Sequence, residues 1–367
     1  MSDKNRDFLF DNYKAFLMIM VIVGHFIQLS YKEHMILYVL KYFIYAFHMP
    51  AFVFVSGYFS KKDAPLTKTI QKVFIPYLAF QLIYCVYYDA MGLNVSWVID
   101  FPKFSLWYLL ALSVWKAVTP YLRKIPYIFW ISLVVSFVFG CFDIEGEWIS
   151  ISRIFVFYPY FLAGMFLNGK QMEKLRTLPC KVVGLGGMAA YIFFAATHAK
   201  DVGFRLNYFY GKASYAGLGL GALEGVSVRL IAYAIGFFMT YAVIALMTKK
   251  ETVFSKIGGK TLSIYLFHGL LLKFLERQTS LLDHVNTIPE IALLLAFCVA
   301  LAFVFSMEPF CKCVNVISGV QVQEIPQTFR LWISDISVPK HSMVLIWTWK
   351  KEESNMPFDA MYVVMAA

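Results

Sequence analysis

The sequence predicts an all-α membrane protein, a polytopic helical bundle of about ten transmembrane helices with a short C-terminal tail. Of its 367 residues, 60% are hydrophobic and 15% are charged, whereas soluble domains are nearer a quarter charged. Apolar runs of about 18 to 24 residues recur, and about 20 helical residues cross the roughly 30 Å hydrocarbon core of a bilayer. Such unbroken runs exclude the roughly ten-residue alternation of a membrane β-barrel. Helices that satisfy their own backbone hydrogen bonds are therefore expected.

The spans follow from the apolar runs in chain order. We expect them at residues 13–31, 36–59, 73–91, 104–122, 125–141, 148–167, 182–198, 226–247, 261–279 and 288–306. The first is an uncleaved span rather than a signal peptide, because residues 1–12 are charged and polar and no small-residue cleavage site follows. One membrane domain is expected over residues 1–306. The tail, 307–367, has strand-like pieces at 329–333 and 343–349 and is either a small appendage or sequence foreign to the rest of the protein.

Basic residues orient this bundle. The net charge of +10 invites a nucleic-acid partner, but in a membrane protein Lys and Arg usually mark cytoplasmic loops. With a cytoplasmic N-terminus, fourteen basic residues fall in the inner loops: Lys61, Lys62, Lys68, Lys72, Arg123, Lys124, Lys170, Lys174, Arg176, Lys181, Lys249, Lys250, Lys256 and Lys260. The short outer stretches hold five: Lys32, Lys103, Lys200, Arg205 and Lys212. We therefore expect both ends of the span bundle in the cytoplasm, a lipid bilayer around it, and no nucleic-acid partner.

The cysteines predict neither a metal site nor a disulfide framework. They are Cys85, Cys141, Cys180, Cys298, Cys311 and Cys313. They are scattered through apolar runs or sit in a single C-x-C, without the paired spacing of a zinc site. We interpret them as packing residues and expect no metal.

The first span carries the most informative pair of side chains. Lys14 and His25 are its only lysine and histidine, and their spacing of eleven closes three helical turns to within about 20°. Both side chains therefore point from one helix face, about 16 Å apart along the axis. An ionisable group in the bilayer costs roughly 2.5–3.5 kcal/mol, so it is usually kept in a site or pathway. The simpler readings are a snorkelling anchor for Lys14 and a hydrogen bond between helices for His25.

Two further spans carry histidines. In the second span, Lys41 and His48 are seven positions apart on one face, and Pro50 follows. In the ninth, Tyr265 and His268 are three apart and adjacent on one face. A hydrogen bond inside the bundle is the alternative reading for His48.

Three other side chains lie near the outer membrane surface. Arg153 and Arg229 sit at similar depths in the sixth and eighth spans, and guanidinium groups bind carboxylates, phosphates or hydroxyl-bearing ligands through directed donors. Trp107 opens the fourth span, where it is either part of an aromatic belt or a platform for a sugar ring. Each arginine is alternatively an interfacial snorkeller.

An ordered set of sequence pieces resembles the acyltransferase-3 family of multi-pass bacterial membrane O-acyltransferases, most closely its fucose-4-O-acetylase-like branch. The resemblance covers roughly residues 7–306. The family usually has Arg at the position of Lys14. A lysine there keeps the positive charge but cannot make the two parallel hydrogen bonds that a guanidinium group makes to one anion. The pieces are Asp11-Asn12-Tyr13-Lys14 with Gly24-His25, Phe47-His48-Met49-Pro50, Ser56-Gly57-Tyr58, Lys72 before Ile75-Pro76-Tyr77, Leu106-Trp107-Tyr108-Leu109, Ser152-Arg153-Ile154, Phe161-Leu162-Ala163-Gly164, Arg229, and Ser263-Ile264-Tyr265-Leu266-Phe267-His268.

This resemblance implies an O-acetyltransferase of the bacterial inner membrane. It would move an acetyl group from cytoplasmic acetyl-CoA, a co-substrate rather than a bound cofactor, to a hydroxyl of a capsule, O-antigen or exopolysaccharide or of its lipid-linked sugar precursor. A sugar hydroxyl has a pKa far above 7, so its attack on a thioester needs a general base, for which histidine is suited near neutral pH. Direct transfer and a covalent acyl-histidine relay both remain open.

The resemblance also implies roles for individual residues. His25 would be the catalytic base, and Lys14 and Lys72 would bind the phosphates of the donor. Lys61 and Lys62 would attract the anion. The expected residues that position the acyl group or the acceptor are His48, Trp107, Arg153, Arg229, Tyr265 and His268.

Two alternatives come from other functional classes. A proton-coupled solute transporter or permease also places His and Arg in its spans, but this chain has no visible internal repeat and no acidic pair within its spans. The other alternative is a structural or partner-binding membrane subunit.

Overall fold

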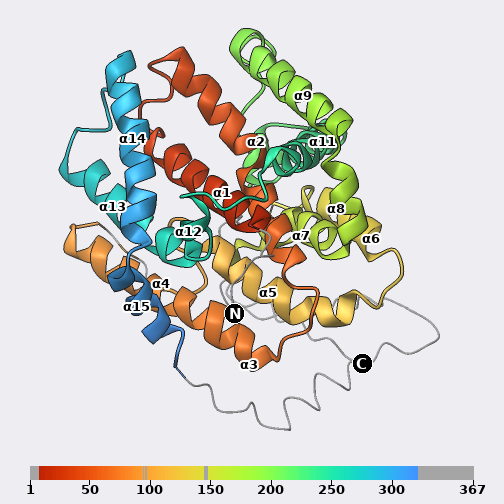
Figure 1. Cartoon of the computed structure of the whole chain (residues 1–367), viewed down its shortest axis with the longest axis horizontal. Coiled ribbons are helices and arrows are strands. Elements are labelled where there is room, and N and C mark those ends of the chain that lie inside the picture. Colours follow the sequence, from red (N-terminus) through yellow and green to blue (C-terminus); the bar gives the residue numbers. More distant parts are fainter. Residues whose placement is uncertain (1–7, 94, 96, 144–147, 321–367) are drawn as a thin grey trace, which may run out of the picture. The chain divides into compact units, whose positions relative to one another are not determined.

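Every regular element of the described chain is a helix. The computed structural model describes residues 8–93, 95, 97–143 and 148–320, whose elements are labelled in Figure 1. The all-α prediction is therefore confirmed for this part. The strand-like pieces expected at 329–333 and 343–349 lie outside the described residues.

Each of the ten predicted spans contains a helix. These helices are α1 (Leu9–Phe26), α2 (Met35–Tyr58), α4 (Ile75–Ala90), α5 (Trp107–Leu122), α6 (Ile128–Phe139), α7 (Ile151–Phe166), α9 (Leu178–Thr197), α11 (Ala222–Leu246), α13 (Thr261–Gln278) and α14 (Ile288–Phe305). The shorter elements are α3 (Leu66–Thr69), η1 (Ile70–Phe74), η2 (Trp148–Ser150), α8 (Gly169–Leu175), α10 (Asn207–Tyr210), η3 (Ala216–Leu218), α12 (Ser255–Gly258) and α15 (Glu308–Ile317).

Seven helices of the described chain are long and apolar enough to cross a membrane, judged by length and composition alone. They are Leu9–Phe26, Met35–Tyr58, Leu66–Ala90, Trp148–Phe166, Leu178–Thr197, Ala222–Leu246 and Ile288–Phe305. Of the other three, α5 has 16 residues and α6 has 12, and α13 carries Lys273, Glu276 and Arg277 toward its end. These observations describe a multi-pass bundle.

Helix α1 lies among α2, α12, α13 and α14 (Figure 1). Its N-terminal end is fastened by Asn12, whose amide nitrogen donates to the backbone carbonyls of Thr248 and Lys250 at 3.0 and 2.9 Å. The hydroxyl of Thr252 donates to the amide oxygen of the same Asn12. Because one buried side chain satisfies both its donors and its acceptor in this loop, the rotation of α1 about its axis is fixed.

The turn that carries Lys72 is wider than an α-helical turn. The π-helical segment η1 joins α3 to α4, and Pro76 follows at the second residue of α4. Proline has no N–H to donate to the carbonyl four residues earlier, here that of Lys72, and its ring crowds that carbonyl. A π turn relieves this crowding, and such turns often occur at functional sites.

Helices α2 and α7 cross at two glycines. A Cβ added to Gly57 would lie 1.8 Å from the carbonyl oxygen of Phe161, and one added to Gly164 would lie 1.8 Å from the carbonyl oxygen of Phe54. Small residues of this kind let two helix backbones touch, which is a common source of helix association in lipid. The crossing therefore leaves no room for any side chain.

We expect Gly164→Ala to destabilise the bundle by about 1–3 kcal/mol, because the methyl group has to push two backbones apart. Gly186→Ala is the matched control, since a Cβ there meets no atom within 4 Å and alanine favours a helix. Thermal unfolding in detergent should show a lower midpoint for Gly164→Ala and an unchanged or higher one for the control. Equal midpoints for Gly164→Ala and the parent protein would contradict the described crossing.

Candidate functional site

A cavity of about 250 Å³ opens between α1, α2, η1, α5 and α13. Lys14 lies near the start of α1, Lys72 just before α4, and Lys116 in the second half of α5. These positions share the side of the bundle that the loop charges assign to the cytoplasm. The cavity is lined by Lys14, Phe52, Val55, Ser56, Phe59, Lys72, Val73, Tyr108, Leu109, Leu112, Lys116, Thr261, Leu262 and Tyr265.

The structure thus brings the two predicted donor-binding lysines to one cavity. Lys14 pairs with Asp11 at 3.1 Å, and its ammonium lies 5.4 Å from the centre of the Phe59 ring. Lys72 donates to the carbonyl of Ser318 at 3.0 Å. The cavity lining includes Lys72 and Lys116 as well and no Asp or Glu, so the Asp11 carboxylate beside Lys14 offsets only part of the positive charge and the cavity favours an anionic ligand.

Lys116 is a third cation of this cavity, and it is not among the residues predicted from the sequence. Its ammonium donates to the hydroxyl of Ser60 at 3.0 Å. A basic residue inside an apolar helix is itself a signal of a site, and Lys116 is the only Lys or Arg within α5. Its role is not predicted from the sequence because the residues around it come from segments that are distant in sequence.

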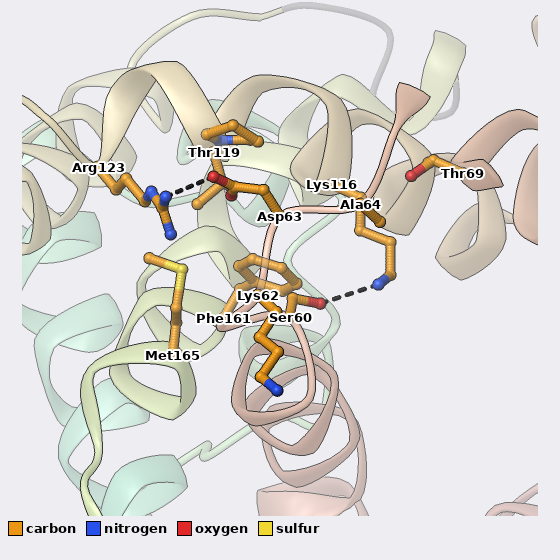
Figure 2. A pocket seen from close by; sticks show the side chains of 11 residues that line it. Ser60, Lys62, Asp63, Ala64, Thr69, Lys116, Thr119, Arg123, Phe161 and Met165 are labelled. Atoms are coloured by element: carbon orange, nitrogen blue, oxygen red, sulfur yellow. Dashed lines mark hydrogen bonds and ion pairs between the residues drawn. The ribbon is translucent and has the colours of Figure 1, made fainter. Parts of the chain in front are cut away.

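Lys116 also lines a second, small hollow of about 20 Å³ at the inner ends of α2 and α5. Figure 2 shows Lys116 directed at Ser60 and Arg123 directed at Asp63, with Lys62 at the same hollow. The inner rim of the cavity is therefore continuous with a wider basic surface.

The predicted steering residue Lys61 is held against the bundle. Its ammonium donates to the carbonyl of Leu167 and lies 3.6 Å from the centre of the Tyr58 ring. Partial burial lowers the pKa of Lys61. Lys61 therefore contributes to the basic surface from a fixed position.

The far end of the cavity is aromatic and carries hydroxyl groups. The Ser56 and Tyr108 hydroxyl oxygens are 2.5 Å apart, so one donates to the other and the acceptor of that bond keeps its own hydrogen free. The ring centroids of Tyr108 and Tyr265 are 5.7 Å apart. This end can therefore supply one hydrogen-bond donor to a ligand that fills the cavity.

Two imidazoles lie one helical turn beyond Tyr265. The His25 and His268 ring centroids are 5.5 Å apart, and that of His268 is 6.0 Å from Tyr265. His25 is half-buried. Lys14 lines the cavity beside Tyr265, and His25 contacts His268, so both side chains of α1 face α13, in agreement with their spacing of eleven.

Hydrogen bonding fixes the protonation pattern of His268. Its Nδ1 is 3.1 Å from the carbonyl oxygen of Ile264, which can only accept, so Nδ1 carries the hydrogen. The Nε2 lone pair remains, and it has no hydrogen-bond partner among the described residues although the side chain is fully buried. His268 therefore offers an acceptor to a ligand.

The loop before α5, residues 97–106, packs against α4 and reaches the C-terminal end of α1. Gln81 is 3% exposed, and its amide nitrogen donates to the carbonyls of Val98 and Phe101 at 2.9 Å each. Its amide oxygen accepts from the backbone N–H of Lys103, also at 2.9 Å. The loop places the Phe104 ring 4.8 Å from that of His25. This loop replaces the first residues of the span expected at 104–122.

Three predicted positioning residues form a neighbouring aromatic cluster. His48 Nδ1 lies 2.9 Å from the carbonyl of Ile44, and its ring is 4.7 Å from that of Tyr45. The guanidinium of Arg153 lies 4.8 Å from the centre of the Trp107 ring. The backbone carbonyl of Tyr210 accepts from Arg153 at 3.4 Å, and the ring of Tyr210 packs 5.2 Å from that of Tyr45.

The structure places Arg229 elsewhere. Its side chain donates to the carbonyl of Ser136 and its guanidinium lies 4.7 Å from the centre of the Tyr215 ring. These contacts fasten α11 to α6. None of the contacts described above for the His25 neighbourhood includes Arg229.

The arrangement is suited to acid–base chemistry on a ligand with an anionic end. It combines a basic rim, a narrow aromatic cavity and two imidazoles beyond the far end. Within residues 8–320, as far as they are described, no group of three His, Cys, Asp or Glu side chains is placed to hold a metal ion.

Comparison with known proteins gives three results. Residues 9–307 match the family described as acyltransferase domain, type 3. The nodulation protein NolL of Sinorhizobium fredii is 26% identical over 195 residues, which cover 46% of this chain and 50% of that protein, so the chain spans about half the length of this curated relative. No solved structure matches.

We expect Gln81→Leu to release the loop at residues 97–106. The substitution removes three hydrogen bonds from partly buried backbone groups, the carbonyls of Val98 and Phe101 and the N–H of Lys103, at a cost of about 0.5–1.5 kcal/mol for each bond. Hydrogen exchange of the loop amides should accelerate more than that of α1. Unchanged exchange of Lys103 and its neighbours would contradict the role given to Gln81.

Proposed function

Because the chain belongs to the acyltransferase-3 family, we propose that it is a membrane O-acetyltransferase that transfers an acetyl group from cytoplasmic acetyl-CoA to a sugar hydroxyl. The acceptor is a cell-surface polysaccharide, such as a capsule or exopolysaccharide, or its lipid-linked precursor. One observation carries the proposal: a cavity with lysines at its inner rim leads toward a pair of imidazoles. Because the sequence resembles the fucose-4-O-acetylase-like branch, a deoxysugar is the acceptor that we propose to test first.

The spacing of Lys14 and His25 along α1 is close to the length of the pantetheine arm of acetyl-CoA. Lys14 and His25 are separated by about 16 Å along α1. The pantetheine arm has twelve bonds between its phosphate ester oxygen and its sulfur, equivalent to four extended residues, or about 14 Å. With the phosphates bound at Lys14, Lys72 and Lys116, the thioester reaches the level of the imidazoles.

The residues then have distinct tasks in direct transfer. His25 takes the proton of the sugar hydroxyl while the oxygen attacks the thioester carbonyl carbon. The free hydrogen of the Ser56 and Tyr108 pair stabilises the negative charge that develops on the carbonyl oxygen. The carbon–sulfur bond breaks, and the coenzyme A thiolate recovers the proton from the His25 imidazolium. The products are the sugar ester and coenzyme A.

We further propose that the two substrates reach the site from opposite sides of the membrane. The basic rim faces the cytoplasm of the cell when the protein lies in the inner membrane with its N-terminus inside. Trp107 and Arg153 lie toward the outer side, where an aromatic face and a guanidinium can hold a sugar. The acceptor then reaches His25 from the side opposite the donor.

We expect His25→Gln to lower the transfer rate by at least 100-fold, because general base catalysis contributes about 10²–10⁴. Binding of coenzyme A, measured by calorimetry on the purified protein, should change by less than about twofold. His198→Gln at the exposed end of α9 is the matched control. Transfer of label from acetyl-CoA to glycan at the parent rate in His25→Gln would refute the role of His25.

We expect Lys116→Gln to raise the KM for acetyl-CoA by about tenfold, because a hydrogen bond to a charged group contributes about 1.5–3 kcal/mol. The kcat should stay within about twofold, since Lys116 is distant from the reacting atoms. The control is Lys124→Gln, an exposed lysine at the end of the same helix. If Lys116→Gln and Lys124→Gln have equal KM values, Lys116 does not bind the donor.

A further inference from the structure

Three buried side-chain polar atoms have no hydrogen-bond partner in the part of the chain that the structure describes: Tyr84 Oη, Ser105 Oγ and His268 Nε2. The side chains are 0%, 6% and 0% exposed, respectively. Unpaired buried polar atoms are rare in proteins, because each has lost its hydrogen bonds to water without replacement. A ligand that supplies the missing partners is one reason for such atoms to persist.

All three atoms belong to residues gathered around Phe104. The Phe104 ring is 6.2 Å from that of Tyr84 and 5.7 Å from that of His268, and Ser105 follows Phe104 in the chain. A Cβ added to Gly269, beside His268, would lie 2.1 Å from Tyr84 Oη and 2.5 Å from the Phe104 ring. Segments from α4, α13 and the loop at 97–106 therefore meet at one place.

Phe104 itself is held in an unfavourable conformation. Its φ is 51°, in the left-handed region that a bulky side chain rarely adopts. Gln81 fixes the loop on one side, and the hydroxyl of Tyr265 donates to the carbonyl of Ser105 on the other. Such conformations persist where the surroundings impose them, often at ligand sites.

We propose that this place is the subsite for the acceptor hydroxyls, a proposal that rests on the acetyltransferase function proposed above. The sugar ring binds against Phe104, and its hydroxyls pair with Tyr84 Oη, Ser105 Oγ and His268 Nε2. Phe104 is 4.8 Å from His25 by ring centroids, so a hydroxyl bound here is beside the catalytic base.

The donor and acceptor pattern defines the class of ligand. Tyr84 and Ser105 can each donate and accept, whereas Nε2 of neutral His268 only accepts, because Nδ1 carries the hydrogen. The ligand must therefore bring at least one O–H donor together with oxygen acceptors. Neighbouring hydroxyls of a neutral pyranose meet this requirement, whereas a fully ionised phosphate has no hydrogen to give to Nε2. The ammonium of Lys273 lies 5.3 Å from the centre of the Phe104 ring, but it is paired with Glu276 at 2.5 Å and so adds no net positive charge for an anion.

The test uses Tyr84→Phe and Ser105→Ala, each of which removes one oxygen atom, with methyl α-L-fucopyranoside as the acceptor probe. The kcat/KM for this probe should fall about five- to tenfold in each variant, as expected for one lost hydrogen bond. The KM for acetyl-CoA and its slow hydrolysis without acceptor should stay within about twofold. The melting temperature should not fall, because the deleted hydroxyls have no protein partner.

Matched controls are Tyr215→Phe and Ser113→Ala, whose hydroxyls donate to the carbonyls of Phe137 and Leu109. These substitutions should lower the melting temperature without changing the kinetics of the acceptor. The subsite is overturned if Tyr84→Phe and Ser105→Ala use the probe as the parent does. It is equally overturned if they lower the melting temperature and impair donor and acceptor together.

Binding of the sugar probe, measured in the absence of acetyl-CoA, separates this inference from the proposed function. Saturation-transfer NMR should detect methyl α-L-fucopyranoside on the parent and a weaker signal on both variants. If the sugar binds in this way but the parent never consumes acetyl-CoA, the acetyltransferase function fails and the subsite stands. If the parent binds neither this probe nor methyl β-D-glucopyranoside, the subsite is not a sugar site.

Discussion

The packing of α1 against α13 determines the geometry of the whole site. Helix α1 is buried along most of its length, and Asn12 fixes its rotation through three hydrogen bonds to the loop that precedes α12. A rigid helix then sets the distance and the common direction of Lys14 and His25. Because α13 supplies Tyr265 and His268 to the same face, the cavity and the imidazoles are aligned by two helices.

The two ends of the site have different chemical character. Three lysines surround the inner rim of a cavity that has no acidic residue in its lining, and this combination favours a ligand with several negative charges. Around Phe104 the available groups are two hydroxyls, a neutral ring nitrogen and the ammonium of Lys273, which lies 5.3 Å from the centre of the Phe104 ring and is paired with Glu276. Because the ion pair adds no net charge, this combination favours an uncharged polyol. A donor with phosphates and an acceptor with hydroxyls would thus be sorted by electrostatics before either reaches His25.

The sequence predicts the helices well because membrane spans are recorded locally, as apolar runs of sufficient length. It also predicts that Lys14 and His25 share a face, since helical spacing alone determines this. The sequence predicts that this span begins at residue 104, because Phe104 is apolar and Ser105 is small, as residues of membrane helices often are. In the structure α5 begins at Trp107, since Gln81, some twenty residues earlier, holds the preceding residues in a loop.

Other parts of the site depend on which helices become neighbours, and a single sequence does not contain this information. Arg153 and Arg229 have similar predicted depths, yet one contacts Trp107 and the other contacts Tyr215 on a different side of the bundle. The depth of a side chain in the membrane follows from its position along the span, whereas the neighbours that it contacts depend on how the helices pack. Lys116, Tyr84 and Ser105 escaped notice for the same reason.

The glycine crossing of α2 and α7 has a mechanical consequence. Where two backbones touch without intervening side chains, they cannot slide or separate without losing the contact, so α2 and α7 move as one rigid unit. His48 of α2 and Arg153 of α7 therefore keep a fixed position relative to each other. Between α4 and α13, by contrast, the atom that crowds Gly269 is the side-chain hydroxyl of Tyr84, and a side chain can move by changing rotamer without displacing a backbone. Opening of the bundle is therefore easier there than at the crossing of α2 and α7.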